Sequence, residues 1–582
     1  MANSRLKKLG GYLRPHWQKV LLGILSLLAV NGLGVYIPLL IRDSIDKLRA
    51  ATITEQVTRY AIVIIVLASV MWFIRMASRI IMFGVGRQVE FDLKQQIFEH
   101  LLILHPSYFY TNTAGDLINR ATSDLDNIRR LVGFAVLSLV NTLFAYALTL
   151  PVMLGINIPL SLAALAVYPI MLISVQLFSD KLRVQQRDVQ ENLSDVSQLI
   201  QEDMSGIASI KIYAQEENER KAFAKKNLAL LNANLSLART RNLLFPIIQG
   251  LVFVSLLILL MMGSGAIARG EITIGDFVAL ILYVERLVFP TALLGFTITA
   301  YQRGEVSIDR VESIFQVEPE IRDLPDAISL SPETIRGEIV VSHLNYTYPG
   351  AKNPALNDVS FSIEPGETVA IVGAVGSGKS TLANTLPRLL FLEPGQVFLD
   401  DCDIAKIKLH DLRRAIAYVP QDSFLFSATI QENISYGKPL SDRTKVVYAA
   451  KTAQIHEEIL NFPQQYDTLV GERGITLSGG QRQRTALARA LLIDAPILIL
   501  DDALSSVDNQ TATQILQNLS SGTSNKTVIF ITHQLSAAAA ADRILVMEAG
   551  KIVQAGTHQQ LFAQQGLYQF LWQQHQLEEV LH

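Results

Sequence analysis

Long apolar runs dominate the first part of the chain, up to about residue 300. Three of them carry no charged residue: Val20 to Ile41, Leu131 to Ser179 and Asn242 to Ala268. A helix needs about 20 mainly apolar residues to cross the hydrocarbon core of a bilayer, and the turn signal from Gly155 to Pro159 divides the second run into two spans. Two further runs are apolar apart from a few charges. The pattern predicts six membrane-spanning helices, at about 19–41, 61–83, 131–154, 159–179, 243–268 and 275–300.

Lysine and arginine are concentrated in the N-terminal segment and in the segments 84–130 and 180–241. Cytoplasmic loops carry an excess of these residues. We therefore expect a multi-pass protein of the cytoplasmic (inner or plasma) membrane, with its N-terminus and the part after the sixth span in the cytoplasm. Both long segments have helical patterns and are expected to extend the spans toward the soluble part. Their tips are expected at Gly115 to Arg130, with Asp116 a coupling candidate, and at Gly206 to Glu217; two small cytosolic hairpins are the alternative.

Charged residues inside the predicted spans are costly in lipid, so they usually face protein or water. Arg75 and Arg79 lie in or near the second span, and Glu285 and Arg286 interrupt the sixth. Glu285 is either a residue of a substrate cavity or the partner of an arginine that holds helices together.

Composition changes at about residue 300. Hydrophobic residues make up 50% of the chain and charged residues only 18%, against about 25% in soluble domains, and the apolar excess lies before that point. The sequence predicts a membrane domain over 1–320, a linker over 321–335 and a soluble domain over 336–582. The net charge of −3 gives no basic field for nucleic acid. A single cysteine, Cys402, excludes an intrachain disulfide.

The soluble part contains a phosphate-binding pattern. The apolar strand from Val369 to Val372 leads into a glycine-rich turn, and a helix begins at about Lys379. Glycines let backbone N–H groups approach phosphate oxygens, and the helix N-terminus adds its positive dipole end. Lys379 has the position of the lysine that reaches the β- and γ-phosphates, and the Ser380 hydroxyl that of a Mg²⁺ ligand. The predicted nucleotide-binding residues of this turn are Gly373, Gly376, Ser377, Gly378, Lys379, Ser380 and Thr381.

Two acidic residues follow a second buried strand. The run Ile497 to Leu500 is apolar and ends in Asp501 and Asp502. An aspartate at the carboxyl end of a strand beside the glycine loop is suited to hold Mg²⁺ through water. The next carboxylate is suited to orient the attacking water.

A second anion-binding pattern lies between these motifs. Leu477, Ser478, Gly479, Gly480 and Gln481 join a glycine-rich turn to an apolar helix, with Ser478 as its expected cap. The glycine loop already holds one side of the γ-phosphate. We therefore expect this second site to serve a nucleotide that is held by another copy of the domain.

Together these motifs resemble the ATP-binding cassette exporters, specifically a half-transporter of the multidrug or lipid exporter type. The resemblance implies an α-helical membrane domain of six transmembrane helices fused to an α/β P-loop nucleotide-binding domain, with ATP and Mg²⁺ as cofactors. It also implies that Tyr348 stacks on adenine, that Gln421 contacts Mg²⁺ and the membrane domain, and that His533 lies near the γ-phosphate. Mg²⁺ ligation falls to Ser380, Gln421 and, through water, Asp501. Glu472 and Arg473 resemble part of the exporter-specific loop, and 503–508 the loop that crosses the dimer interface.

One position departs from the family pattern, in which the residue after the Mg²⁺-holding aspartate is usually glutamate. Here it is Asp502, whose carboxylate reaches about 1.5 Å less far. The resemblance therefore extends to the weakly hydrolysing subunit of a heterodimeric bacterial exporter. In such an exporter the intact signature sequence, here Leu477 to Gln481, completes the nucleotide site of a paralogue that carries the glutamate. A slow homodimer, such as a lipid or lipid-linked-sugar flippase, is the alternative. Soluble repair ATPases, importers and channels with a vestigial cassette fit the spans and motifs less well. The sequence leaves drugs, lipids, lipid-linked sugars and peptides open as substrates.

Overall fold

The computed structural model describes residues 2–50, 54–331, 334–471, 474, 476–505, 507, 511–512, 514–515 and 526–581. Contacts divide the chain into two compact units. Unit 1 comprises 1–102 and 112–317, and unit 2 comprises 103–111 and 318–582. The change of unit at 317/318 lies close to the predicted domain boundary, whereas the assignment of 103–111 to unit 2 is not foreseen by the sequence.

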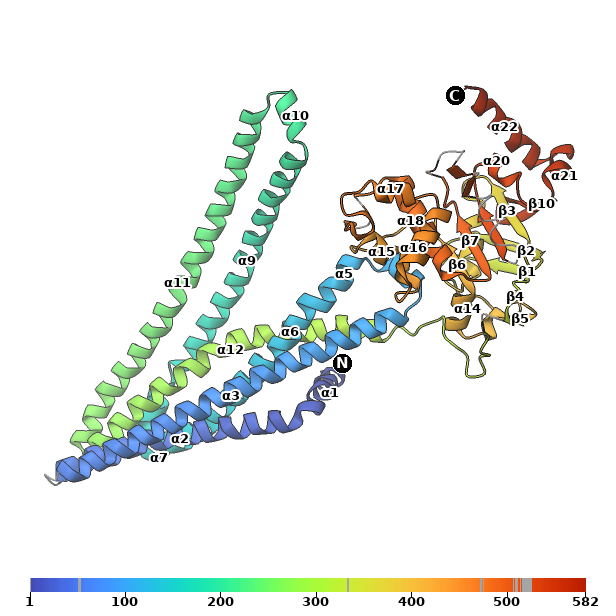
Figure 1. The fold of residues 1–582 in the computed structure, drawn as a ribbon. Coiled ribbons are helices and arrows are strands. Elements are labelled where there is room, and N and C mark those ends of the chain that lie inside the picture. The colour runs from blue at the N-terminus through green and yellow to red at the C-terminus, as the bar shows by residue number, and fades with distance from the viewer. Residues whose placement is uncertain are drawn as a thin grey trace. The chain divides into compact units, whose positions relative to one another are not determined.

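Unit 1 is entirely helical in its described residues (Figure 1). Six of its helical stretches are long and apolar enough to cross a membrane: Lys7–Lys47, Thr58–Ile103, Ala114–Ile156, Ile158–Ser205, Glu216–Ala268 and Ile274–Phe315. The helices that compose unit 1 are α1 (Ala2–Leu13), α2 (Trp17–Ala50), α3 (Thr54–Ile103), α5 (Ala114–Asn119), α6 (Leu125–Arg130), α7 (Val136–Ile156), α8 (Ile158–Leu165), α9 (Tyr168–Ser205), α10 (Ile207–Ile212), α11 (Glu216–Ala268) and α12 (Ile274–Phe315). The six predicted spans each fall within one of the six stretches.

The helices continue well past the hydrocarbon length, and the structure locates their bends. The hairpin of α9 and α11 turns at α10 (Figure 1), within the predicted tip at 206–217. The other bend was predicted wrongly. It lies at 104–113, between the end of α3 and the start of α5, and 115–130 belongs to the returning helix. Pro106 begins α4 and Thr113 caps α5, and both residue types favour a helix start at these positions.

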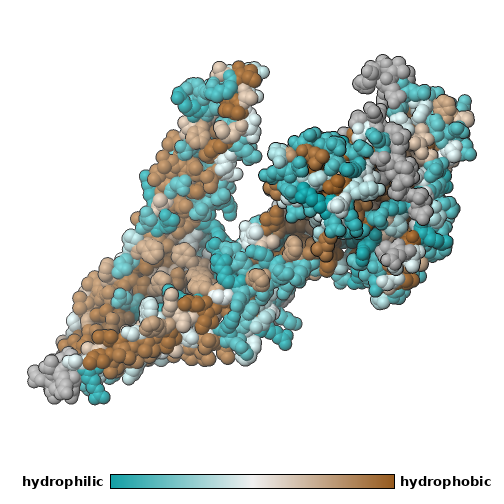
Figure 2. Space-filling view, in the orientation of Figure 1, coloured by the Kyte–Doolittle hydropathy of each residue, from teal (hydrophilic) through white to brown (hydrophobic). Residues whose placement is uncertain are grey.

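Close helix packing builds the interior of unit 1. Tyr283 of α12 is fully buried, and its hydroxyl donates to the Val35 carbonyl of α2 at 2.7 Å. Ser255 of α11 donates to the Ala164 carbonyl of α8 at 2.7 Å. Many large apolar side chains remain on the outside, and Figure 2 shows them gathered over the bundle. An apolar exterior around a core with satisfied polar groups is the arrangement that a lipid environment requires.

Unit 2 is built on two sheets. The larger has the strand order β10-β9-β3-β8-β7-β6, in which β9, β3, β8, β7 and β6 are parallel and β10 is antiparallel. The smaller is antiparallel, in the order β2-β1-β4-β5. The strands are β1 (Ile339–Tyr346), β2 (Leu356–Ile363), β3 (Thr368–Gly373), β4 (Val397–Leu399), β5 (Cys402–Asp403), β6 (Ile416–Val419), β7 (Ile497–Asp501), β8 (Thr527–Ile531), β9 (Arg543–Glu548) and β10 (Lys551–Gly556).

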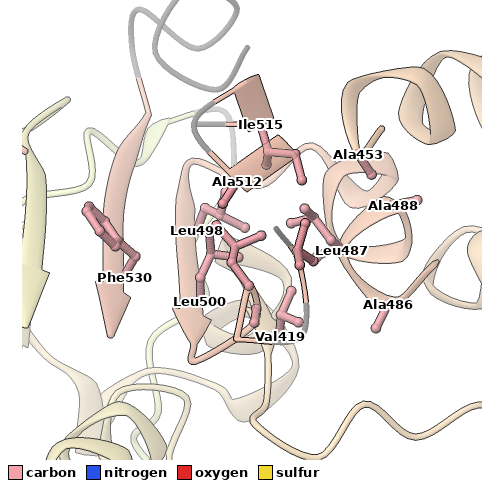
Figure 3. Close-up of a cluster of buried hydrophobic side chains, with 14 of the residues drawn as sticks. Val419, Ala453, Ala486, Leu487, Ala488, Leu498, Leu500, Ala512, Ile515 and Phe530 are labelled. Atoms are coloured by element: carbon pink, nitrogen blue, oxygen red, sulfur yellow. The ribbon is translucent and has the colours of Figure 1, made fainter. Parts of the chain in front are cut away.

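The helices of unit 2 pack on this framework. Leu487 of α18 faces Leu498 and Leu500 of β7 in a common buried cluster (Figure 3). Every residue of β7 and β8 is buried, as expected for parallel strands that are covered on both faces. The helices are α4 (Pro106–Thr111), α13 (Lys379–Thr385), α14 (Leu409–Ala415), α15 (Ile430–Ile434), α16 (Arg443–Thr452), α17 (His456–Leu460), α18 (Gly479–Ile493), α20 (Leu535–Ala538), α21 (His558–Ala563) and α22 (Leu567–Leu581).

The segment predicted as a linker makes ordered contacts within unit 2. Ile328 forms a parallel bridge with Ile407, and its N–H donates to the Lys406 carbonyl at 2.7 Å. The Asp411 carboxylate accepts from the Ser329 hydroxyl and the Leu330 N–H, which lowers the pKa of Asp411. Residues 328–330 of the predicted linker therefore pack on the rest of unit 2.

Candidate functional site

The candidate site lies where parallel strands of the larger sheet end. Asp501 pairs in register with Ile531, and Ile371 of β3 pairs with Ile531 from the other side. The carboxyl ends of β3, β7 and β8 therefore share one edge of the sheet. Loops that follow parallel strands at this edge form the usual ligand site of open α/β sheets. The fold thus brings together motifs that lie more than a hundred residues apart in the sequence.

The glycine-rich loop follows β3 and precedes α13. Gly378 caps α13 with φ +99°, and a Cβ at this position would lie 2.5 Å from the Ala355 carbonyl oxygen. Only glycine adopts this backbone conformation without strain in the space available. The loop therefore turns tightly into the helix and leaves its N–H groups facing the place of an anion.

Lys379 folds back over this loop. Its side chain is 6% exposed, and Nζ donates to the carbonyl oxygens of Gly373 and Ala374 at 2.9 Å each. Burial lowers the pKa of Lys379, while the charges of Asp502 and Asp501 oppose that effect. The ammonium group is thus held beside the loop without a direct ion pair among the described residues, in the position where a phosphate would meet it.

Asp501 connects the two phosphate motifs. It is 2% exposed, and its Oδ1 accepts from the Ser380 hydroxyl at 2.9 Å. The Tyr418 hydroxyl lies 3.3 Å from Asp501 Oδ2 and 3.0 Å from Asn384 Oδ1. Burial raises the pKa of Asp501, and the hydrogen bonds from Ser380 and Tyr418 act against that rise. A hydroxyl and a carboxylate side by side are oxygen donors of the kind that Mg²⁺ prefers.

Asp502 lies beside Asp501 at the same edge. Its backbone is left-handed, with φ +50°, and its N–H donates to the Ile531 carbonyl at 3.0 Å. Burial raises the pKa of Asp502, against the attraction of His533 and Lys379. His533 follows β8 and is exposed. The structure therefore brings Asp502, His533 and Lys379 into one electrostatic group.

Two other predicted residues take different positions. Tyr348 lies with its hydroxyl 3.2 Å from Thr381 Oγ1 in the first turn of α13 and stands edge-to-face with Tyr346. It is therefore next to the phosphate loop. Gln421 is exposed in the loop after β6, and no hydrogen bond joins its side chain to another residue within the described ranges.

The signature residues cap α18. Ser478 Oγ accepts from the Gln481 N–H at 3.2 Å, and Gln481 Oε1 accepts from the Ser478 N–H at 2.9 Å. Gln481 also donates to Glu458 at 2.9 Å. Leu477 is 5% exposed and Gly479 begins the helix, followed by Gly480. No hydrogen bond joins 477–481 to 373–381 within the part of the chain that the structure describes.

Four residues of unit 2 that lie near these motifs were not identified from the sequence. Gln483 donates to Ser505 Oγ at 2.9 Å and lies 3.4 Å from the Asp502 carbonyl, which ties the signature helix to the loop after Asp502. Tyr418 and Asn384 belong to no motif, and only the fold brings the Tyr418 hydroxyl to Asp501, with Asn384 accepting from the same hydroxyl. His575 of α22 lines a pocket of about 220 Å³ with Gly373 and His533. No sequence signal links the C-terminal helix to the nucleotide loop.

Four further candidates were named from the sequence. Glu472 and Arg473 lie outside the described residues. Asp116 lies in the first turn of α5, directly after the bend at 104–113, and forms ion pairs within unit 1 with Arg120 and Arg310 at 2.7 Å each. Glu285 is exposed on α12 and lines a cavity, and it forms no ion pair with any residue of the described chain.

Unit 2 also contains the bend between α3 and α5. His105 lies 3.7 Å from Glu320 as an ion pair. Tyr110 is near enough to Tyr346 and Tyr418 to contribute to raising the pKa of both phenols, although burial is the main cause. The segment 103–111 therefore belongs to the same body as the nucleotide motifs, close to the tyrosine that contacts Asp501.

Comparisons with known proteins agree with this geometry. Residues 20–291 match the ABC transporter transmembrane region, and residues 356–505 match the ABC transporter family. A probable multidrug resistance ABC transporter ATP-binding/permease protein of Bacillus subtilis, YheI, is 35% identical over 99% of this chain and 98% of its own length. The multidrug resistance-like ATP-binding protein MdlA of Escherichia coli is 32% identical over 99% and 97%. The structure of a bacterial Atm1-family ABC exporter with ATP bound is 26% identical, covers 96% of this chain and 99% of that one, and gives a TM-score of 0.77.

Proposed function

This chain belongs to the ABC transporters, as an exporter half-transporter and transport ATPase, and on that premise we propose that it exports or flips a hydrophobic or amphipathic substrate across the cytoplasmic membrane. It is a multi-pass membrane protein whose cassette binds ATP, and ABC exporters function as dimers of half-transporters. The lysine and arginine bias supports a cytoplasmic N-terminus and cassette. Transport proceeds by alternating access, in which ATP closes the two cassettes and the membrane helices open outward.

The hydrogen bond of 2.9 Å between Ser380 and Asp501 carries the proposal for the nucleotide site. It joins the end of the glycine loop to the end of β7, so that one ion can be held by both motifs. Ser380, Gln421 and, through water, Asp501 would hold Mg²⁺, and the ion would neutralise charge on the β- and γ-phosphates. Lys379 would bind the same phosphates, Tyr348 would stack on adenine, and His533 would contact the γ-phosphate.

We propose that this chain's own site hydrolyses ATP slowly. Asp502 stands where a water-positioning glutamate is usual, and its carboxylate is one methylene shorter. A displacement of about 1 Å at a catalytic group lowers a rate by about 100-fold. Asp502 is half-buried, which raises its pKa, and its shorter reach limits how well it orients water. Catalysis by this class of site depends on positioning and electrostatics.

The partner is proposed to be a paralogous half-transporter that carries the glutamate. The signature of this chain is intact and preorganised by its capping box. Its lack of hydrogen bonds to the glycine loop among the described residues supports a role toward another copy's nucleotide. A slow homodimer, such as a lipid or lipid-linked-sugar flippase, is the second candidate, since the same motifs would then serve two weak sites.

ATPase activity in proteoliposomes tests the proposal. The chain alone should turn over slowly, and coexpression with a glutamate-bearing paralogue should raise turnover. Lys379→Ala in this chain is the reference for loss of nucleotide binding at its own site. Full turnover by the chain alone would refute the heterodimer, and transport by Lys379→Ala at the wild-type level would refute ATP-driven export through this cassette.

A further inference from the structure

A cavity of about 600 Å³ opens inside the helix bundle of unit 1. It is lined by residues of α2, α3, α7 and α12, of which α2, α7 and α12 pack against one another in the membrane-spanning region (Figure 1). Three arginines line it: Arg75 and Arg79 of α3 and Arg286 of α12. The lining residues include a single carboxylate, Glu285, together with aromatic and aliphatic side chains. The lining is therefore apolar with a net positive charge.

The three arginines lie deep along their helices. Arg286 is twelve residues into α12 from Ile274, which corresponds to about 18 Å at 1.5 Å per residue. Arg75 and Arg79 lie in the apolar part of α3. Ionised side chains at such depth are unfavourable in hydrocarbon and mark a functional site by default.

Neutral groups hold Arg286 in place. Its Nη2 donates to the Asn31 carbonyl oxygen at 3.2 Å and to Asn31 Oδ1 at 3.0 Å, and Asn31 Nδ2 donates to Asn141 Oδ1 at 3.1 Å. Gly34 makes the space, since a Cβ there would overlap the guanidinium. Asn31 supplies geometry but no negative charge. The Arg286 Nε atom is buried and has no hydrogen-bond partner in the described part of the chain.

No ion pair of the described residues neutralises the arginines of this cavity. Within the described ranges, Arg75, Arg79 and Arg286 form no ion pair, and Glu285 forms none either. Structural arginines inside membranes usually pair with a carboxylate or with backbone carbonyls. Arg286 does so through the Asn31 carbonyl, whereas the hydrogen bond of Arg75 within the described chain goes to the Met71 sulfur, at 3.6 Å.

A second cavity of about 540 Å³ lies next to the first, because Phe83 and Phe134 line both. Its lining adds four arginines, among them Arg183, Arg241 and Arg303, and no carboxylate of the described residues. Arginines and phenylalanines therefore line both cavities inside the bundle. Guanidinium groups bind phosphate and carboxylate in a planar, bidentate manner, and the aromatic rings suit an apolar chain.

We propose that this arginine-lined cavity binds an anionic amphiphile, with its phosphate or carboxylate group on Arg75, Arg79 and Arg286 and its apolar part along the phenylalanines. The inference rests on the proposed export function and narrows its substrate class. The anionic group is that of a membrane lipid or of a free amphiphile, and both present the same chemistry to the arginines.

Direct binding tests this assignment independently of ATP hydrolysis. The full chain with its partner subunit is placed in nanodiscs of zwitterionic phosphatidylcholine, and binding of radiolabelled dodecyl phosphate is measured. The Arg75→Gln/Arg79→Gln double variant should weaken binding at least about tenfold, which corresponds to roughly 1.4 kcal/mol. Both side chains are exposed in this half-transporter, so the folded protein should persist. Arg239→Gln is the matched control, because Arg239 is exposed on α11 and lines neither cavity.

Competition defines the ligand. Dodecyltrimethylammonium and inorganic phosphate should each compete at least about tenfold more weakly than unlabelled dodecyl phosphate. Displacement by phosphatidylglycerol identifies a lipid source, and its failure to displace identifies a free amphiphile. Equal binding of the cationic amphiphile, or unchanged binding by the double variant, would overturn the proposal. ATPase activity of the wild type and of Lys379→Ala is measured in the same nanodiscs. It tests the proposed ATP-driven function separately from ligand binding.

Discussion

At the scale of single residues, Asp501 connects the structural elements that form the nucleotide site. Its carboxylate accepts from Ser380 and lies near the Tyr418 hydroxyl, so three elements converge on one buried acid. A buried carboxylate with few donors is unfavourable when ionised, and a bound cation would relieve that cost. The ionised Asp501 carboxylate is therefore unfavourable in the absence of a cation, and relief of this cost would contribute to the affinity for a metal–nucleotide complex.

The pH dependence of stability tests this account. Because burial raises the pKa of Asp501, the folded state binds its proton more tightly than the unfolded state. The resulting cost is absent below the ordinary value of 3.8, develops as the pH rises above it, and is complete above the raised pKa. Each unit of pKa corresponds to about 1.4 kcal/mol. In thermal unfolding without metal and nucleotide, Asp501→Asn should gain stability over the wild type with rising pH. A difference independent of pH would contradict the account.

We expect the length of the Asp502 side chain to limit the rate of hydrolysis at this site. Asp502→Glu should raise single-turnover ATP hydrolysis by up to about 100-fold, because the longer side chain restores the reach toward water. Rapid-quench measurement of ADP formation follows the effect. Asp502→Asn is the control, since it keeps the length and removes the charge, and it should not raise the rate. Equal rates for glutamate and aspartate would show that reach is not the limiting factor.

At the scale of elements, close approach of helices places the cavity residues. Gly34 of α2 lies against the Arg286 guanidinium of α12, and Tyr283 of the same helix bonds to the Val35 carbonyl. The two helices therefore meet through a glycine and a buried hydrogen bond. Small residues at such contacts are what membrane helix pairs require, since van der Waals packing drives their association.

Alanine substitutions on α2 test this packing. Gly34→Ala should lower the thermal midpoint in detergent by the equivalent of about 1–3 kcal/mol, because the added methyl group overlaps Arg286. Gly32→Ala is the matched control on the same helix, since a Cβ at Gly32 meets nothing within 4 Å. It should be neutral or slightly stabilising, as alanine restricts the unfolded chain. Similar losses for both variants would refute the specific role of Gly34.

At the scale of the whole molecule, the signature and the glycine loop are two halves of different composite sites in the proposed dimer. Ser478 caps α18 and presents its N-terminus, but the described residues of the same chain place no phosphate loop in hydrogen-bond contact with it. A half-transporter of this composition is expected to be incomplete alone. In the proposed dimer, the partner would supply the missing side of each bound nucleotide.

A cap substitution in the mixed dimer tests this division. Ser478→Ala should lower turnover at the partner's site by about tenfold, through loss of the cap and of the hydroxyl that we propose contacts the partner's nucleotide. Thr557→Ala is the matched control, because Thr557 caps α21 with an equivalent capping box. It should cost similar stability without the loss of turnover. If Ser478→Ala leaves turnover unchanged, the signature does not complete the partner's site.

The amino-acid sequence by itself determined the six apolar stretches, the fused α/β domain and the order of the phosphate motifs, because hydrophobic periodicity and glycine–lysine spacing act locally. The tertiary structure alone decided the bend at 104–113, which the sequence misplaced at 115–130, and the position of the Tyr418 hydroxyl between Asp501 and Asn384. It also decided that the membrane arginines line a cavity rather than pair with Glu285. Such contacts depend on strand order and helix rotation, which long-range packing sets and no local pattern encodes.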